Sequence, residues 1–134
     1  MPPRYTKPAL LAFSMFLAGL VILADSGRGG WLFALAGRIP AGDKLGHFLL
    51  FGTLSCLLNG HWRGRTLRLF GGTALSGSTL IMAVVTLEEC SQVFFRSRTF
   101  DLLDLAADAV GIWFGGRLVM AGLRRQPARP PATA

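Results

Sequence analysis

The chain has 134 residues, of which 51% are hydrophobic, and it carries 14 basic residues against 7 acidic ones. This length suits a single domain, and the hydrophobic fraction with a mean hydropathy of +0.47 exceeds the usual mix of a soluble domain, which favours a membrane protein. The basic residues lie between apolar segments and do not gather on one polar face, which argues against a nucleic-acid-binding protein.

Four apolar segments are each close to the roughly 20 residues that an α-helix needs to cross a bilayer. They cover residues 8–24, 45–62, 69–87 and 102–123. The first could be a signal peptide, but its apolar run is long and Ile22 stands where cleavage after Ala24 requires a small residue, so we expect a retained anchor. The expected fold is all-α, a polytopic membrane protein with a bundle of four transmembrane helices in one domain, residues 1–123.

The flanking segments predict the orientation of this bundle. Most basic residues flank the cytoplasmic ends of the spans if both termini lie in the cytoplasm, as the positive-inside rule requires. The first outer loop, residues 25–44, contains GGWLFALAG, which is too short to span and is expected at the membrane interface. The tail, residues 124–134, is basic and proline-rich and is expected to be a disordered cytoplasmic end.

All seven acidic residues fall at or near the outer membrane face in this topology. With about 100° of rotation per helical residue, the last segment places three acids and two glycines on one stripe: Asp101, Asp104, Asp108, Gly111 and Gly115. The other two helices carry the pairs Asp43 with His47 and Glu89 with Gln92, each on a single helix face. Because ionisable residues are expensive within a membrane, this convergence predicts a functional site.

The predicted site is rich in carboxylates, because the acids there outnumber Lys44, Arg96 and Arg98. Crowded carboxylates at low dielectric must be protonated, exposed to water, or neutralised by a bound cation or cationic group. We expect no cofactor or metal. A hard divalent cation is the alternative, since one histidine with several carboxylates suits such an ion better than zinc. Glu88 points about 100° away from Glu89 and is expected at the solvated rim.

Three stretches of the chain resemble the VanZ-like family of small bacterial membrane proteins, named for an accessory protein of teicoplanin resistance. The stretches are DKLGHFLLFGTLSCLL, EECSQ and RTFDLLDLAADAVGIWFGG, and the resemblance covers residues 42–116. The matching positions of the family pattern are Asp43, Lys44, His47, Glu89, Gln92, Arg98, Asp101, Asp104, Asp108 and Gly111. Asp108 departs from the pattern, because the family usually has Asn there. The resemblance implies a multi-pass protein of the bacterial plasma membrane.

The predicted ligand-binding residues are Asp43, His47, Glu89, Gln92, Arg98, Asp101, Asp104 and Asp108. Our first hypothesis is a pocket for a membrane lipid headgroup, a cell-wall precursor or a glycopeptide, with an effect on teicoplanin susceptibility. Arg98 would bind a phosphate or carboxylate, and the acids would bind amines or hydroxyls.

Two alternatives stay open for this cluster. The protein could be an enzyme in which His47 with Glu89 or Asp104 performs acid–base chemistry on a lipid-linked substrate. It could instead be a structural or partner-binding protein whose polar cluster holds the helices together. Single residues could also have purely structural roles: Asp43 and Asp101 could stabilise helix N-termini, and His47 could be a hydrogen-bonded structural histidine.

Overall fold

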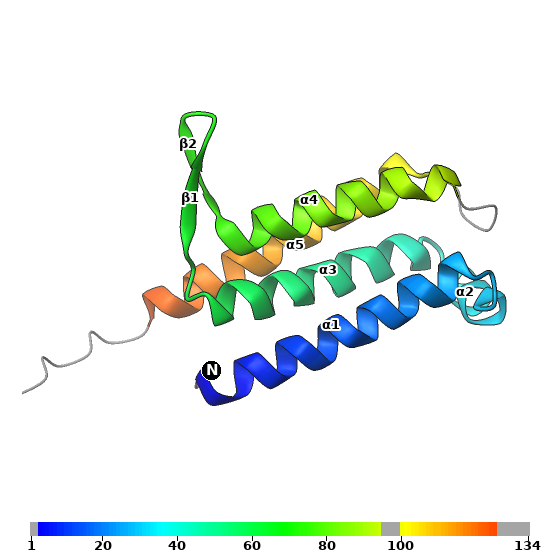
Figure 1. Ribbon diagram of the computed structural model, residues 1–134, viewed down its shortest axis with the longest axis horizontal. Helices are drawn as coiled ribbons and strands as arrows, with labels where there is room; N and C mark the ends of the chain where they lie inside the picture. The colour runs from blue at the N-terminus through cyan, green and yellow to red at the C-terminus, as the bar shows by residue number, and fades with distance from the viewer. Residues whose placement is uncertain (1–2, 95–99, 126–134) are drawn as a thin grey trace, which may run out of the picture.

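The computed structural model describes residues 3–94 and 100–125, and most of these residues are helical (Figure 1). The helices are α1 (Pro3–Asp25), α2 (Gly30–Ala36), α3 (Gly42–His61), α4 (Ser76–Ser91), the short 3₁₀ helix η1 (Gln92–Phe94) and α5 (Leu102–Arg124). Two short strands, β1 (Thr66–Leu69) and β2 (Gly72–Leu75), form an antiparallel hairpin between α3 and α4.

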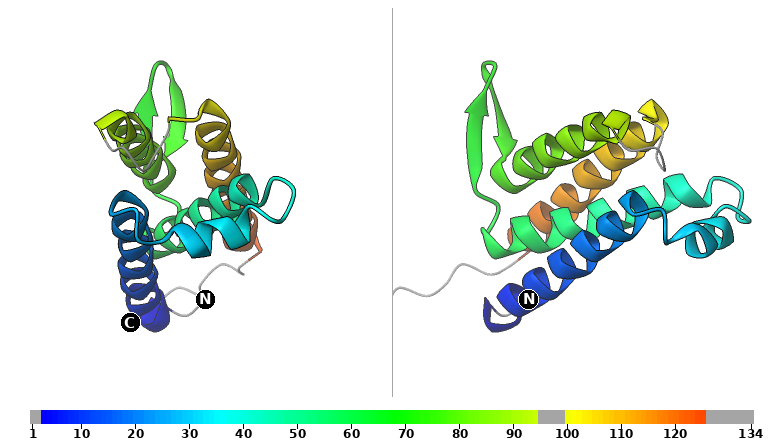
Figure 2. Two further views of the ribbon diagram at one scale, coloured as in Figure 1. Left: turned by 90° about the vertical axis from the view of Figure 1, so that its right-hand side faces the viewer. Right: turned by 45° about the vertical axis from the view of Figure 1, so that its right-hand side comes forward.

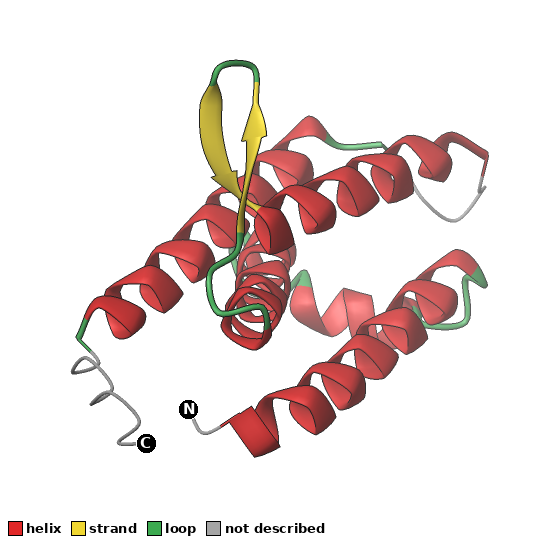
Figure 3. Ribbon diagram, turned by 60° about the vertical axis from the view of Figure 1, so that its left-hand side comes forward, coloured by secondary structure: helices red, strands yellow, loops and turns green. Residues whose placement is uncertain are grey.

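The four long helices run side by side, and α3 contacts α1, α4 and α5, with its most extensive interface on α5 (Figures 1 and 2). The hairpin stands out from the helices at the end where α1 begins and α5 ends, which we call the hairpin end. The opposite end, where α3 and α5 begin and α4 ends, we call the acidic end. The two ends of the described chain therefore lie at the same end of the bundle, as an even number of antiparallel helices requires (Figure 3).

The hairpin corrects the expectation of an all-α fold and of a helix over residues 69–87. The helix begins only at Ser76, because residues 66–75 alternate in a strand-like pattern around Phe70-Gly71-Gly72. Phe70 and Gly71 both have positive φ, 49° and 81°, which is the backbone of the tight turn that joins two antiparallel strands. The register pairs Thr66 with Leu75 and Leu69 with Gly72.

Glycines let α3 and α5 pack backbone to backbone. A Cβ atom on Gly111 would lie 3.0 Å from the Phe48 carbonyl carbon, and one on Gly115 would lie 3.1 Å from the Cys56 nitrogen and would collide with the Gly52 carbonyl oxygen. The Gly111 and Gly115 pair therefore serves close packing within the chain. Beside this contact, Ile81, Val85 and Ile112 form a small apolar core.

A buried polar cluster lies nearer the hairpin end, and nothing in the sequence pattern predicted it. Asn59 and Ser55 are fully buried on α3. The Asn59 amide donates to the Ser55 carbonyl oxygen and to the Ser78 hydroxyl on α4, both at 2.9 Å, while the Ser55 hydroxyl donates to the Ile112 carbonyl oxygen on α5 at 2.8 Å. These bonds join three helices through their interior.

Within the described chain, one helix is long and apolar enough by itself to cross a membrane. It is the part of α1 from Thr6 to Asp25, with a mean hydropathy of 2.0. The helix α4 has only 16 residues, although η1 continues it. The arrangement of four helices is thus observed, whereas their passage through a bilayer stays a prediction.

Candidate functional site

The acidic end brings together seven of the eight predicted ligand-binding residues. Three helices supply them: α3 carries Asp43 and His47, the end of α4 with η1 carries Glu89 and Gln92, and the start of α5 carries the aspartates. The eighth residue, Arg98, lies outside the described residues.

Lys44 is the centre of charge neutralisation at this end. Its Nζ lies 2.9 Å from Asp43, 3.0 Å from Asp101 and 2.8 Å from Asp104. The hydrogen bond from Lys44 holds the pKa of Asp43 below its usual value. The pKa of Asp101 is also lowered, by the backbone N–H of Leu103 and by Lys44. The carboxylates, with Asp104 first, raise the pKa of Lys44 in return, so it stays protonated at neutral pH.

The predicted ligand-binding set omits Lys44, although its place in the DKxxH pattern is a signal that could have included it. In the part of the chain that the structure describes, no three or more His, Cys, Asp or Glu side chains are grouped to hold a metal ion. The positive charge that the carboxylates need comes at least in part from this lysine.

Asp101 begins α5 and ties it to α4. Its Oδ1 accepts a hydrogen bond from the Leu103 backbone N–H at 2.8 Å, so Asp101 caps α5, which was one of the two roles considered for it. Its own backbone N–H donates to Glu89 Oε1, also at 2.8 Å. Asp43 does not cap α3, because Ala41 occupies the cap position with a left-handed backbone. The Asp43 carboxylate lies in the first turn, where the helix dipole still favours it.

Glu89 is buried and both of its oxygens accept hydrogen bonds within the chain. Oε1 accepts from Asp101 as described, and Oε2 accepts from Gln92 Nε2 at 2.8 Å. The carboxylate is only 1% exposed. Because both oxygens already accept hydrogen bonds, a structural role for Glu89, joining the end of α4 to the start of α5, is favoured over a role as proton donor or acceptor.

The partly buried His47 pairs with the buried Asp108. The ring Nδ1 lies 2.9 Å from Asp108 Oδ1, and Nε2 lies 3.9 Å from Asp104 Oδ2. Asp108 is fully buried, and its Oδ2 has no hydrogen-bond partner among the described residues. In its ionised form Asp108 can only accept, and Nδ1–H is then the donor of this hydrogen bond, with Nε2 on the side of Asp104.

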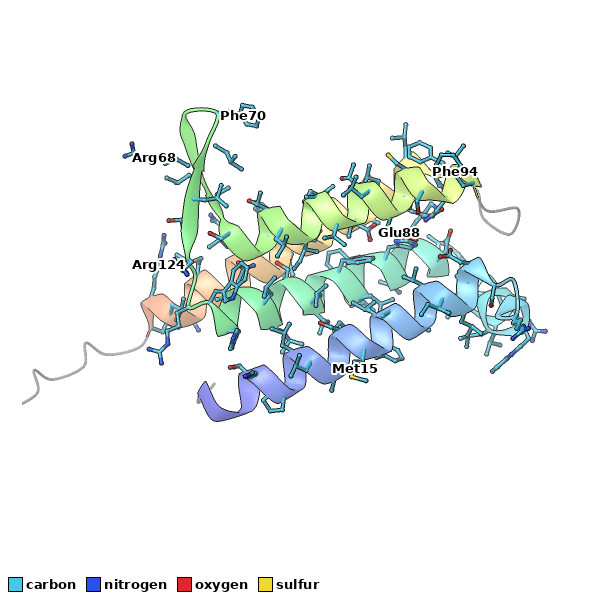
Figure 4. The ribbon with its side chains drawn as sticks, viewed as in Figure 1. Met15, Arg68, Phe70, Glu88, Phe94 and Arg124 are labelled. Atoms are coloured by element: carbon cyan, nitrogen blue, oxygen red, sulfur yellow. The ribbon has the colours of Figure 1, made fainter. Side chains whose placement is uncertain are left out.

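A cleft of about 410 Å³ opens beside these residues. Its polar lining is His47, Glu88, Gln92 and Asp104, and its apolar lining includes Leu17, Leu20 and Val21 of α1 and Phe51 of α3. Glu88 is half-buried, points from α4 toward α3 (Figure 4), and accepts from Gln92 Nε2 at 3.2 and 3.3 Å, so it is more than a solvated rim residue. The contribution of α1 was not predictable, because apolar residues on a first span carry no local signal of a ligand.

The arrangement resembles the binding site of an amphiphile. One side of the cleft offers hydrogen-bond acceptors and an imidazole, and the other offers aliphatic side chains.

Comparison with known proteins adds no relative: no protein-family model matches the chain, and no curated protein and no solved structure is significantly similar to it.

Proposed function

We propose that the protein is a multi-pass protein of the bacterial plasma membrane whose four spans are residues 8–24, 45–62, 76–94 and 102–123. The distribution of side chains supports this placement. In the described chain, six polar side chains but only four apolar ones are buried. Large apolar side chains such as Leu87 and Trp113 are instead exposed, and Met15, which is 76% exposed, points outward from α1 (Figure 4). An apolar exterior around a polar interior suits lipid surroundings and would be unfavourable in water.

The charges support both termini being cytoplasmic. The hairpin end carries Arg63, Arg65, Arg68, Arg124 and Arg125, while the acids lie toward the acidic end. Since positively charged segments stay on the cytoplasmic side, the acidic end faces outward. With Cys56 and Cys90 changed to Ser, an impermeant maleimide on intact cells should label Ser26→Cys and leave Arg68→Cys unlabelled until the cells are permeabilised. The reverse pattern would invert the orientation.

We further propose that the cleft at the acidic end binds an amphiphilic envelope ligand, and the cleft's mixed lining is the observation that carries the proposal. The lining acceptors, Glu88 and Asp104, suit the amine or hydroxyl donors of a lipid headgroup, a lipid-linked cell-wall precursor or a glycopeptide. Leu17, Leu20 and Val21 suit an alkyl or polyprenyl chain. In keeping with the VanZ-like resemblance, occupancy of this cleft would alter teicoplanin susceptibility.

The His47–Asp108 pair favours one second candidate, an enzyme that modifies a lipid-linked substrate. A histidine held by a buried carboxylate at 2.9 Å, with its other nitrogen toward an open cleft, has the arrangement of an acid–base group. In that case Asp108 orients the ring and Asp104 faces the reacting nitrogen. Turnover of a radiolabelled cell-wall precursor by the purified protein, lost in His47→Gln, would decide for the enzyme.

Binding is tested with the full chain in detergent by native mass spectrometry. The probes are phosphatidylethanolamine and a lipid-linked cell-wall precursor, both of which carry an amine. Asp104→Asn removes a charge from the cleft and should lower retention of both, while Asp25→Asn, an acid at the same end outside the cleft lining, should not. Equal retention by the wild type and Asp104→Asn would remove the cleft as the binding site. Circular dichroism checks that both variants keep their helices.

A further inference from the structure

A second cavity, of about 690 Å³, lies at the hairpin end between the hairpin, α4 and α5. It shares no lining residue with the cleft at the acidic end. Its lining combines two arginines, several hydroxyls and large apolar side chains, among them Arg117, Arg124, Thr66, Thr73, Trp113 and Met120.

One face of α5 supplies most of the lining. Trp113, Arg117, Met120 and Arg124 are spaced by four, three and four residues, so they follow one another along a single helix face. The Arg117 guanidinium carbon lies 5.6 Å from the centre of the Trp113 ring, within cation–π range. The ring thus holds a positive charge at the cavity.

These arginines have no carboxylate partner in the described chain. All seven acidic residues belong to the described residues and lie toward the acidic end, and none of the ion pairs among them involves Arg117 or Arg124. Two guanidinium groups at one cavity, neither with a carboxylate partner among the described residues, form a site for an anion, because Arg presents several N–H donors in a planar fork.

The hairpin adds hydroxyl groups to the same cavity. The strand register pairs Thr66 with Leu75 and Arg68 with Thr73, so Thr66, Arg68 and Thr73 share one face of the hairpin. Thr66 and Thr73 line the cavity, and neither hydroxyl makes a hydrogen bond within the described chain. Free hydroxyls beside guanidinium groups are suitable donors for phosphate oxygens.

We propose that this cavity binds a net-negative glycerophospholipid, whose phosphate contacts Arg117 and Arg124 and whose acyl chains lie along Trp113 and Met120. The apolar lining favours a lipid over free phosphate, and the positive charge favours phosphatidylglycerol over zwitterionic phosphatidylcholine. This site goes beyond the acidic cleft, and it depends on the proposed membrane placement alone.

Trp113 lines the cavity and can report its occupant. With Trp31 and Trp62 changed to Phe, Trp113 is the sole tryptophan, and lipids brominated on their acyl chains quench its fluorescence on contact. In bilayers of mixed composition, brominated phosphatidylglycerol should quench at about tenfold lower mole fraction than brominated phosphatidylcholine. The double variant Arg117→Gln/Arg124→Gln should abolish this preference, whereas Arg28→Gln/Arg38→Gln, with the same charge change at the other end, should keep it.

Each other outcome overturns a stated part of the proposal. Equal quenching by the two lipids overturns the acidic-lipid site while leaving the membrane placement intact. Absence of quenching by either lipid overturns both. Relief of quenching by millimolar inorganic phosphate shows that the site takes the free ion instead. Retention of phosphatidylglycerol over phosphatidylcholine by the wild-type chain, measured by native mass spectrometry, gives the same comparison if the tryptophan variants do not fold.

Discussion

Replacing Gly111 or Gly115 by Ala tests whether the contact between α3 and α5 positions the candidate site. The added Cβ on Gly115 would collide with the Gly52 carbonyl oxygen and lie 3.1 Å from two further backbone atoms. Backbone atoms cannot turn aside as a flexible side chain would. Since relaxed carbon contacts lie near 3.5–4.0 Å, the helices must separate by roughly 1 Å.

The expected effect of each replacement on stability is the difference of two terms. Overpacking costs about 1–3 kcal/mol. The higher helix propensity of Ala returns at most about 1 kcal/mol. The propensity gain is common to every Gly→Ala change in a helix, so we expect each variant to be about 1–3 kcal/mol less stable than a Gly→Ala control without a clash. Gly46→Ala and Gly122→Ala are matched controls on the same two helices, because a Cβ there meets no atom within 4 Å. Unfolding is followed by circular dichroism in a mild detergent.

The same shift should reach the site. Gly111 lies one helical turn after Asp108, and Phe48, which its Cβ would strike, directly follows His47. A separation of roughly 1 Å would stretch the 2.9 Å contact between His47 and Asp108 beyond hydrogen-bonding distance. Gly111→Ala should therefore also weaken ligand retention. Stability equal to that of the two controls would refute the close backbone contact.

Three further predictions concern the polar interior. Asp108→Asn keeps a hydrogen bond to His47 and should leave the free energy of unfolding nearly unchanged. Asp108→Leu leaves the imidazole ring without its partner and should lower that free energy by about 1–3 kcal/mol. Equal losses of the two variants in thermal unfolding would contradict this. Gly77→Ala places a Cβ 2.5 Å from the Asn59 amide oxygen and should cost about 1–3 kcal/mol of unfolding free energy. When Asn59 is also changed to Ala, this cost should be at least about 1 kcal/mol smaller, because the clashing amide is gone. Additive losses in the double-mutant cycle would speak against the contact. The exposed carboxylates that pair with Lys44 have lowered pKa values, so their contribution to stability is present above about pH 4 and is lost as the pH falls through the folded-state pKa. Lys44→Met should accordingly show a shallower decline of the melting temperature between about pH 4 and pH 2, and superimposable acid curves would exclude the proposed pairing.

The helices that carry the site were predictable because their signals are local. The segment 102–123 matches α5 closely, since Asp101 is a helix-capping residue and the apolar run after it is unbroken. The spacing of polar residues on each helix face likewise predicted that three helices meet at the acidic end. The segment 69–87 was misread, because average hydropathy hides the strand alternation around Phe70.

The remaining features of the site depend on tertiary contacts that no local pattern encodes. Lys44 is one charge among several until the fold places three carboxylates around its Nζ. The Glu89 carboxylate has a hydrogen-bond donor for each oxygen only because the fold brings the backbone N–H of Asp101, twelve positions later, beside it. The buried cluster around Asn59 unites residues from three helices, and each of them alone is an ordinary polar residue of a helix.

The residue at the tip of the hairpin, Phe70, is unfavourable for the stability of the fold. Phe70 has a φ of 49°, and a bulky residue in this left-handed conformation costs about 1–2 kcal/mol, while its ring lies fully in the open and gains no contact within the described chain. Asn followed by glycine is the pair that such a turn prefers. Stability alone would therefore favour Phe70→Asn, because no contact within the described chain compensates for the aromatic ring at this position.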